Sequence, residues 1–148
     1  MQELVGVDGR KAFNNNFLKL YFCDTGLCAY LTRWLTVESL RDGAASGHFY
    51  ENYVVMELVK NYAYSKRLAL LSFYRDSNAK EIDVFVEENG KIHPLEIKKS
   101  ANPDKKEIKK YSVLEKTTIE KSHGGIICMV SKPFPIDREN NLIPSNLI

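Results

Sequence analysis

Apolar and polar residues alternate along two stretches that are separated by the pair Asn89-Gly90. The stretches cover residues 81–87 and 91–98, and a period of two is typical of β-strands. An Asn-Gly pair between two such strands favours a two-residue turn, because both residues accept left-handed backbone angles. The pattern therefore predicts a β-hairpin.

The turn fixes which residues of the two strands face each other. Counting from it places Asp83 opposite Glu96 and Glu81 opposite Lys98. Directly opposed side chains share one face of the sheet, with Cβ atoms about 5 Å apart. One face therefore gathers these charged groups at the end of the hairpin far from the turn. The other face is expected to form the core and carries Ile82, Val84, Val86, His93, Leu95 and Ile97.

Apolar residues at helical spacing predict a long helix over residues 48–64. Glu51 is expected in the first turn of this helix, where the helix dipole favours a carboxylate. A tail that is mostly irregular, with room for one short edge strand, is expected after residue 130. The other predicted elements are a strand over 68–74, a turn over 75–78, a helix over 103–114 and a buried strand over 126–130.

The N-terminal part of the chain is patterned more weakly. The first 16 residues show no clear period, and residues 14–16 predict a loop. A short strand is expected over residues 17–23. Two helices are expected after it, one capped by Asp24 or Thr25 and one capped by Thr36.

The order helix, strand, hairpin, helix, strand predicts an α/β fold with a mixed central sheet that helices cover on both faces. We expect residues 1–46 to form an N-terminal helical extension and residues 47–148 to form the main domain. With 148 residues, 44% of them hydrophobic, the chain is long enough to build a sizeable core.

Several classes of protein are disfavoured by composition. No run of about 18 apolar residues is present, so no membrane span is expected. The first residues lack the apolar stretch of a signal peptide, which predicts a cytoplasmic protein. Three cysteines without C-x-x-C spacing argue against both a disulfide framework and a zinc site.

Charge is distributed unevenly, although the net charge is only +2. Residues 1–90 hold 10 Lys/Arg and 12 Asp/Glu, whereas residues 91–116 hold 8 lysines and 4 acids. A phosphate backbone would be attracted to this basic segment, which includes Lys105, Lys106, Lys109 and Lys110. For any single lysine, an ordinary solvated surface position is the alternative.

The charged face of the predicted hairpin is the main candidate for chemistry. Asp83 and Glu96 repel each other when both are ionised, so a shared proton, Lys98 or a bound cation is needed to stabilise the pair. Mg²⁺ suits this need, since it takes oxygen ligands and commonly binds one or two carboxylates. The alternative is an exposed hairpin face with solvated charges.

These residues also carry a resemblance to a known family. Asp83, followed by Glu96-Ile97-Lys98 on the next strand, resembles the D...(D/E)-x-K signature of the PD-(D/E)XK nuclease superfamily, which has the restriction-endonuclease fold. The chain also resembles the DUF4143 domain, which typically forms the C-terminal part of bacterial and archaeal AAA-type ATPases. No proline precedes Asp83, which departs from the signature. The second resemblance rests on residues 20–27, 47–52, 73–76, 81–83 and 95–100.

The resemblance implies a restriction-endonuclease-like αβββαβ core and a nuclease that uses Mg²⁺ or Mn²⁺. Its catalytic residues would be Glu51, Asp83, Glu96 and Lys98, with Asp83, Glu96 and Glu51 as metal ligands. The expected partners are a nucleic acid, in the first place DNA, and an AAA-type ATPase module in cis or in trans, since the chain has no Walker A motif. The alternative is a non-catalytic accessory domain that binds DNA or protein. The sequence leaves the oligomeric state open.

Overall fold

A computed structural model of the chain describes residues 2–7, 18–67, 69–76, 80–116 and 120–148. The predicted loop at 14–16 and part of the predicted turn at 75–78 lie outside these residues. The elements are β1 (Gln2–Val7), β2 (Leu18–Tyr21), α1 (Thr25–Leu31), α2 (Val37–Asp42), α3 (Ser46–Tyr64), β3 (Leu70–Arg75), β4 (Glu81–Glu88), β5 (Lys91–Lys98), the 3₁₀ helix η1 (Lys105–Lys116), β6 (Glu120–Lys121), β7 (Gly124–Cys128), β8 (Phe134–Pro135), β9 (Asn140–Pro144) and the 3₁₀ turn η2 (Ser145–Leu147).

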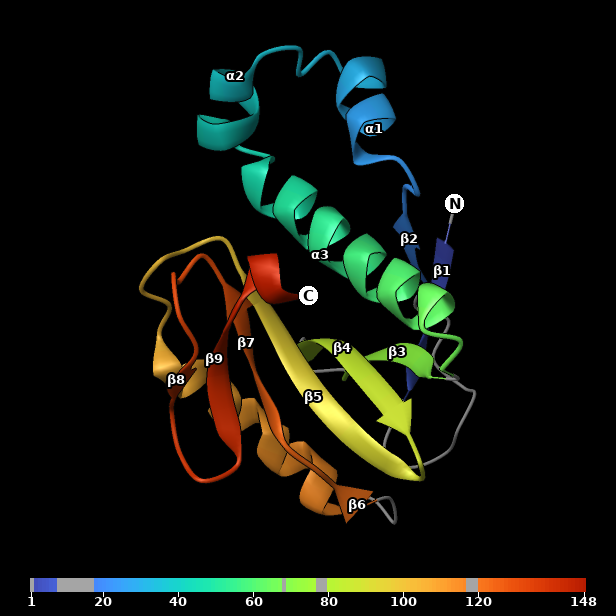
Figure 1. Ribbon diagram of the computed structural model, residues 1–148, viewed down its shortest axis with the longest axis vertical. Helices are drawn as coiled ribbons and strands as arrows, with labels where there is room; N and C mark the ends of the chain where they lie inside the picture. The colour runs from blue at the N-terminus through green and yellow to red at the C-terminus, as the bar shows by residue number, and fades with distance from the viewer. Residues whose placement is uncertain (1, 8–17, 68, 77–79, 117–119) are drawn as a thin grey trace.

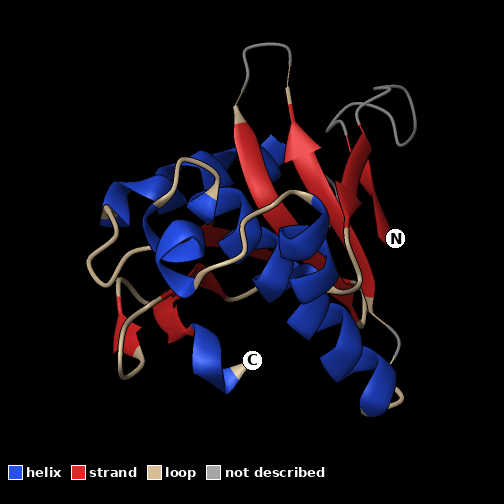
Figure 2. Ribbon diagram, turned by 90° about the horizontal axis from the view of Figure 1, so that it is seen from above, coloured by secondary structure: helices blue, strands red, loops and turns tan. Residues whose placement is uncertain are grey.

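Within the described part of the chain, nine strands form one mixed sheet in the order β2-β1-β3-β4-β5-β7-β9-β8, with β6 beside β5. The hairpin partners β3, β4 and β5 are antiparallel, whereas β5, β7 and β9 run parallel. Helix α3 crosses one face of the sheet and η1 lies against the other (Figure 1). Figure 2 shows helices on both sides of the strands. The predicted mixed sheet with flanking helices is therefore confirmed.

The β4–β5 hairpin has the predicted register. Pairing runs from Glu88–Lys91 at the turn to Val84–Leu95. Asn89 and Gly90 have φ angles of 53° and 74°, as the predicted two-residue turn requires.

Beyond this point the hairpin departs from the prediction. Between Ser72 and Tyr74 of β3 the register with β4 shifts by one, so that Asp83 and Val84 together oppose Phe73. Such a bulge turns the following side chain to the other face. Ile82 was predicted on the core face with Val84, and this is wrong: it packs on the η1 side.

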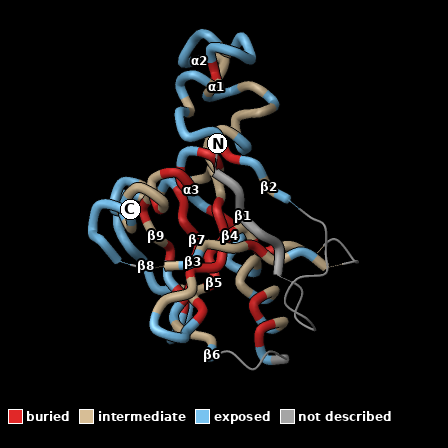
Figure 3. The backbone as a smooth tube through the Cα atoms, turned by 90° about the vertical axis from the view of Figure 1, so that its right-hand side faces the viewer, coloured by how far each residue is buried: buried red, intermediate tan, exposed pale blue. Residues whose placement is uncertain are grey.

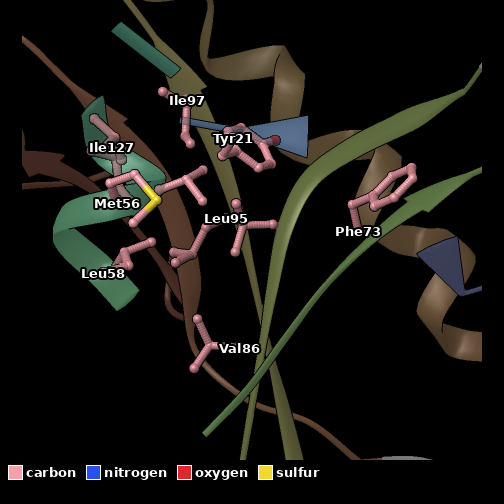
Figure 4. Packing of buried hydrophobic residues seen from close by; sticks show 11 residues of the cluster. Tyr21, Met56, Leu58, Phe73, Val86, Leu95, Ile97 and Ile127 are labelled. Carbon is pink, nitrogen blue, oxygen red and sulfur yellow. The ribbon is translucent and has the colours of Figure 1, made fainter. Parts of the chain in front are cut away.

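The two faces of the sheet carry separate cores. On the α3 side, Met56 and Leu58 pack against strand residues that include Val86, Leu95 and Ile97 (Figure 4). On the η1 side the buried residues are Ile82, Phe85, Ile92, Tyr111 and Leu114. Both faces of the hairpin are therefore largely buried, including the face that was predicted to be charged.

The segment predicted as a helical extension, residues 1–46, also contributes strands. Its first described residues form β1, which pairs with β2 antiparallel and with β3 in parallel. Helices α1 and α2 follow as predicted, capped by the side chains of Asp24 and Thr36. They project from the sheet and are largely exposed (Figure 3).

Two predicted helices differ in detail. Helix α3 begins at Ser46, two residues earlier than predicted, so Glu51 lies in its second turn and the helix dipole no longer accounts for it. The predicted helix over 103–114 is η1, which is wound as a 3₁₀ helix. Within the described residues, no helix is long and apolar enough to cross a bilayer.

Candidate carboxylate–lysine site

Asp83 lies at the base of the hairpin, in the bulge of β4. Its Oδ2 accepts a 2.8 Å hydrogen bond from the main-chain N–H of Ile97. In a regular antiparallel pair this N–H would donate to a main-chain carbonyl of β4. The Asp83 side chain therefore takes the place of that carbonyl as the acceptor. The carboxylate is thereby fixed between the two strands, and its side chain is only 14% exposed.

Glu96 is the most deeply buried charged residue of the site, at 1% exposed. Its Oε1 accepts from Lys98 Nζ at 2.9 Å and from Lys110 Nζ at 2.8 Å. Lys110 extends from η1 and also pairs with Glu107 at 3.0 Å. The second oxygen, Oε2, is buried and has no hydrogen-bond partner in the described structure. An unsatisfied buried carboxylate oxygen is costly, so a proton or a cation would be stabilised there.

Lys19 of β2 holds a second group of carboxylates together. Its ammonium lies 3.0 Å from Glu51 Oε1 and 3.9 Å from Asp83 Oδ1, and it also pairs with Glu81. The hydroxyl of Tyr21, two residues further along β2, donates to the same Glu51 oxygen at 2.8 Å. Glu51 is therefore directed into the site by β2.

The protonation states follow from these contacts. Burial and then the charge of Glu96 raise the pKa of Asp83 to about 7, although the hydrogen bond from the N–H of Ile97 opposes the shift. Burial alone would lower the pKa of Lys19 and Lys98, but their carboxylate partners outweigh it and the pKa of each is raised. Both lysines are therefore charged at neutral pH, and the Asp83 carboxyl keeps a proton up to about pH 7.

A cavity of about 430 Å³ opens over the site. It is bounded by the start of α3 and the base of the hairpin, and Glu51, Asp83, Lys98 and Lys99 line it. A lining that combines carboxylates with ammonium groups suits a ligand that brings both a cation and an anionic group, such as a phosphate.

The donor atoms fit a hard divalent ion held by two carboxylates. Asp83 and Glu96 are oxygen donors, the charge of Glu96 raises the pKa of Asp83, and among the described residues Glu96 Oε2 has no hydrogen-bond partner. Among the described residues, no group of three or more His, Cys, Asp or Glu side chains is arranged to hold a metal ion. An ion here would complete its coordination with water or substrate, as Mg²⁺ commonly does.

Of the four predicted site residues, Glu51, Asp83 and Lys98 line this cavity, whereas Glu96 is buried outside its lining and contacts Lys98. The structure also adds Lys19, Tyr21 and Lys110. Lys110 was predicted with the surface lysines, but its ammonium is buried against Glu96 and is only 19% exposed. Glu81 and Lys98 were predicted to oppose each other; instead, Glu81 pairs with Lys19 and Arg75, and Lys98 with Glu96 and Glu107.

Fold and site together define an α/β domain with a buried carboxylate–lysine centre at the base of a central hairpin. Residues 46–148 match the family described as Domain of unknown function (DUF4143), and because this is more than half of the chain, the protein belongs to that family. Residues 20–27, and with them Tyr21, lie outside the match, as does Lys19. No curated protein and no solved structure matches the chain.

Proposed function

We propose that this protein is a metal-dependent nuclease of the PD-(D/E)XK type that hydrolyses phosphodiester bonds of DNA. The observation that carries the proposal is the pair Asp83 and Glu96. One carboxyl titrates near neutrality and the other has a buried oxygen without a partner, beside a charged lysine that faces a cavity. Perturbed carboxyls in a cavity are typical of functional sites.

Asp83 and Glu96 would hold Mg²⁺ or Mn²⁺, which when bound supplies Lewis-acid polarisation of the phosphate and lowers the pKa of a bound water. Lys98 acts through its charge, because an ammonium with a raised pKa is a poor base. It stabilises the negative charge that develops on the phosphate in the transition state. Glu51 faces the same cavity and positions the attacking water.

The order of elements supports this proposal. Helix α3 is followed by β3, β4, β5, η1, the two-residue strand β6 and β7. Apart from β6, this is the αβββαβ order expected for a restriction-endonuclease-like core. The bulge at Asp83 adds support, since β-bulges often re-aim a side chain at an active site. A fold alone does not establish chemistry, so the proposal depends on the site.

A non-catalytic accessory domain that binds DNA or an AAA-type ATPase is the second candidate. The observation in its favour is the apolar surface of α1 and α2, where Leu31 is 61% exposed and Val37 is 72% exposed. Exposed apolar clusters often mark protein interfaces. In this case the lysine–carboxylate pairs would serve only to stabilise the fold.

Cleavage of plasmid DNA and single-stranded DNA in Mn²⁺ tests the proposal. We expect cleavage by the wild type and a loss of about 100-fold or more in Lys98→Ala, which is typical for removal of one charge-stabilising donor. Lys60→Ala is the control, because Lys60 pairs with Glu57 on the exposed face of α3. Equal loss in both variants would indicate a fault in the preparation.

Metal binding is measured separately by thermal unfolding with and without Mn²⁺. A metal held by Asp83 and Glu96 raises the Tm of the wild type and leaves Asp83→Ala unchanged. Absence of cleavage and of a metal-dependent Tm shift would contradict the nuclease proposal. DNA binding that survives Asp83→Ala but declines when Lys105, Lys106 and Lys109 are neutralised would favour the accessory domain.

A further inference from the structure

A larger cavity of about 550 Å³ adjoins the carboxylate site. It lies among β2, the N-terminal helices and the start of α3, and it shares Glu51 and His48 with the smaller cavity. Its volume is within the usual range for small-molecule sites. The aromatic side chains in its walls are Tyr21, Phe22, Trp34 and Phe49.

Charges in the larger cavity cancel. Lys19 and Arg75 lie in its lining together with Glu51 and Glu81, and the ion pairs Lys19–Glu51 and Arg75–Glu81 join them at 3.0 Å and 3.7 Å. A phosphate would gain little from such a balanced set, whereas a neutral planar ring would gain from the aromatic walls. The smaller cavity is also lined by two carboxylates and two lysines, and there the divalent ion of the proposed metal site would add the positive charge that attracts a phosphate.

Two polar side chains of the aromatic cavity, Tyr21 and Asn52, are engaged within the protein. The Tyr21 hydroxyl donates to Glu51, and the Asn52 amide donates to the main-chain carbonyl of Phe22 and to the Thr25 hydroxyl. These groups are therefore not free to recognise the edge of a base. Stacking on aromatic rings holds any base, since every base has a π-face.

The ring of Trp34 is fixed in place. It lies against Phe49 with ring centroids 5.9 Å apart, and a Cβ atom on Gly43 would come within 2.3 Å of its Cη2. This close contact with the backbone of Gly43 holds the indole in the cavity wall.

We propose that the aromatic cavity binds one unpaired nucleobase of a nucleic-acid strand whose phosphate lies in the smaller cavity. The inference rests on the proposed function and narrows its substrate to single-stranded or locally unpaired nucleic acid. A base inside a duplex is stacked and paired, and it must leave the stack to enter a protein cavity.

Trp34 is the only tryptophan of the chain, so its fluorescence reports directly on the cavity. A single-stranded thymidine oligonucleotide, a hairpin duplex and free dTMP are titrated in EDTA, which prevents cleavage. We expect saturable quenching by the single strand, with an affinity roughly 5- to 150-fold higher than for the duplex, the range that corresponds to stacking of one base.

Two variants that each add an aromatic ring locate the binding. Thr32→Phe fills the cavity from an exposed position in its lining, and Val37→Phe adds the same ring outside it. The preference for the single strand should be lost in the first and kept in the second. A preference that survives Thr32→Phe, equal affinity for strand and duplex, or equal affinity for dTMP and strand would each overturn the inference.

The two proposals fail separately in these experiments. If the protein prefers the single strand but shows no Mn²⁺-dependent cleavage, only the nuclease proposal is contradicted. The binding assay contains EDTA and therefore does not depend on a bound metal. Cleavage that depends on Lys98, combined with equal affinity for strand and duplex, contradicts the base-binding cavity alone.

Discussion

Replacement of Asp83 by Asn removes a carboxyl group whose ionised form is disfavoured in the folded protein. The carbonyl oxygen of the amide still accepts the N–H of Ile97, which in the wild type donates to Asp83 Oδ2 at 2.8 Å. The NH₂ group can donate to Glu96, whose Oε2 has no partner within the described structure. The variant can therefore keep these hydrogen bonds, while it loses the titration of Asp83 and its 3.9 Å ion pair with Lys19.

The expected magnitude follows from proton linkage. The pKa of Asp83 is about 7 in the folded protein against an ordinary value of 3.8, so the native state binds a proton that the unfolded chain has already released. The free energy of unfolding therefore falls as pH rises through this window and is restored below it. A difference of about three pH units corresponds to roughly 4 kcal/mol, of which about 2 to 3 kcal/mol is lost between pH 5 and pH 8.

Urea unfolding at several pH values, followed by circular dichroism, measures this effect. Asp83→Asn has no such titration, so its stability relative to the wild type should increase by about 2 to 3 kcal/mol between pH 5 and pH 8. Asp42→Asn is a suitable control, because Asp42 is 63% exposed and Arg41 lowers the pKa of its carboxyl. Its difference from the wild type should stay nearly constant over the same range.

A constant difference between Asp83→Asn and the wild type would show that Asp83 does not titrate near neutrality in the fold. A constant difference in which the wild type is the more stable protein at every pH would show that the ionised carboxylate is stabilised, with Lys19 as the dominant neighbour at 3.9 Å. Either result would refute the raised pKa of Asp83.

Two further predictions concern the cation at this site. Lys19→Met removes an ammonium from three carboxylates, so the metal-free variant should have a lower Tm, and Mn²⁺ should raise that Tm by more than it raises the wild-type Tm. Lys60→Met is the control. An equal rise in Tm with Mn²⁺ in Lys19→Met and in the wild type would show that Lys19 and the metal do not compete for the same carboxylates. Metal binding must displace the proton of Asp83, so the Mn²⁺ affinity measured by calorimetry should rise about tenfold per pH unit below pH 7 and level off above it. A flat profile would indicate that Asp83 is not a ligand.

Local signals in the sequence predict the hairpin well. The Asn89-Gly90 turn determines the register, and Asp24 and Thr36 are recognisable caps whose hydrogen bonds the structure contains. These features depend on neighbours within a few residues. The bulge at Asp83 depends on pairing between β4 and β3, and no glycine or proline marks it in the sequence. Its position therefore appears only in the assembled sheet.

Contacts between distant segments account for the residues that sequence analysis missed. Lys110 was grouped with the surface lysines because η1 was predicted without knowledge of which of its residues face the sheet. In the structure it reaches Glu96 beside Lys98. The charge run 105–110 is therefore divided: Lys105, Lys106 and Lys109 are exposed, whereas Lys110 stabilises a buried carboxylate.

Strand β2 reverses the usual rule that apolar residues face inward. Leu18 and Leu20 are 55% and 56% exposed, whereas Lys19 points to the carboxylates and Tyr21 is buried. A hydrophobic pattern alone would assign the opposite faces. Since exposing two leucines is unfavourable, this orientation is stabilised by the ion pairs of Lys19 and the hydrogen bond of Tyr21 to Glu51. A segment outside the family match thus supplies the ammonium that balances the acidic site, and the charge state of that site depends on β2 being docked in the sheet.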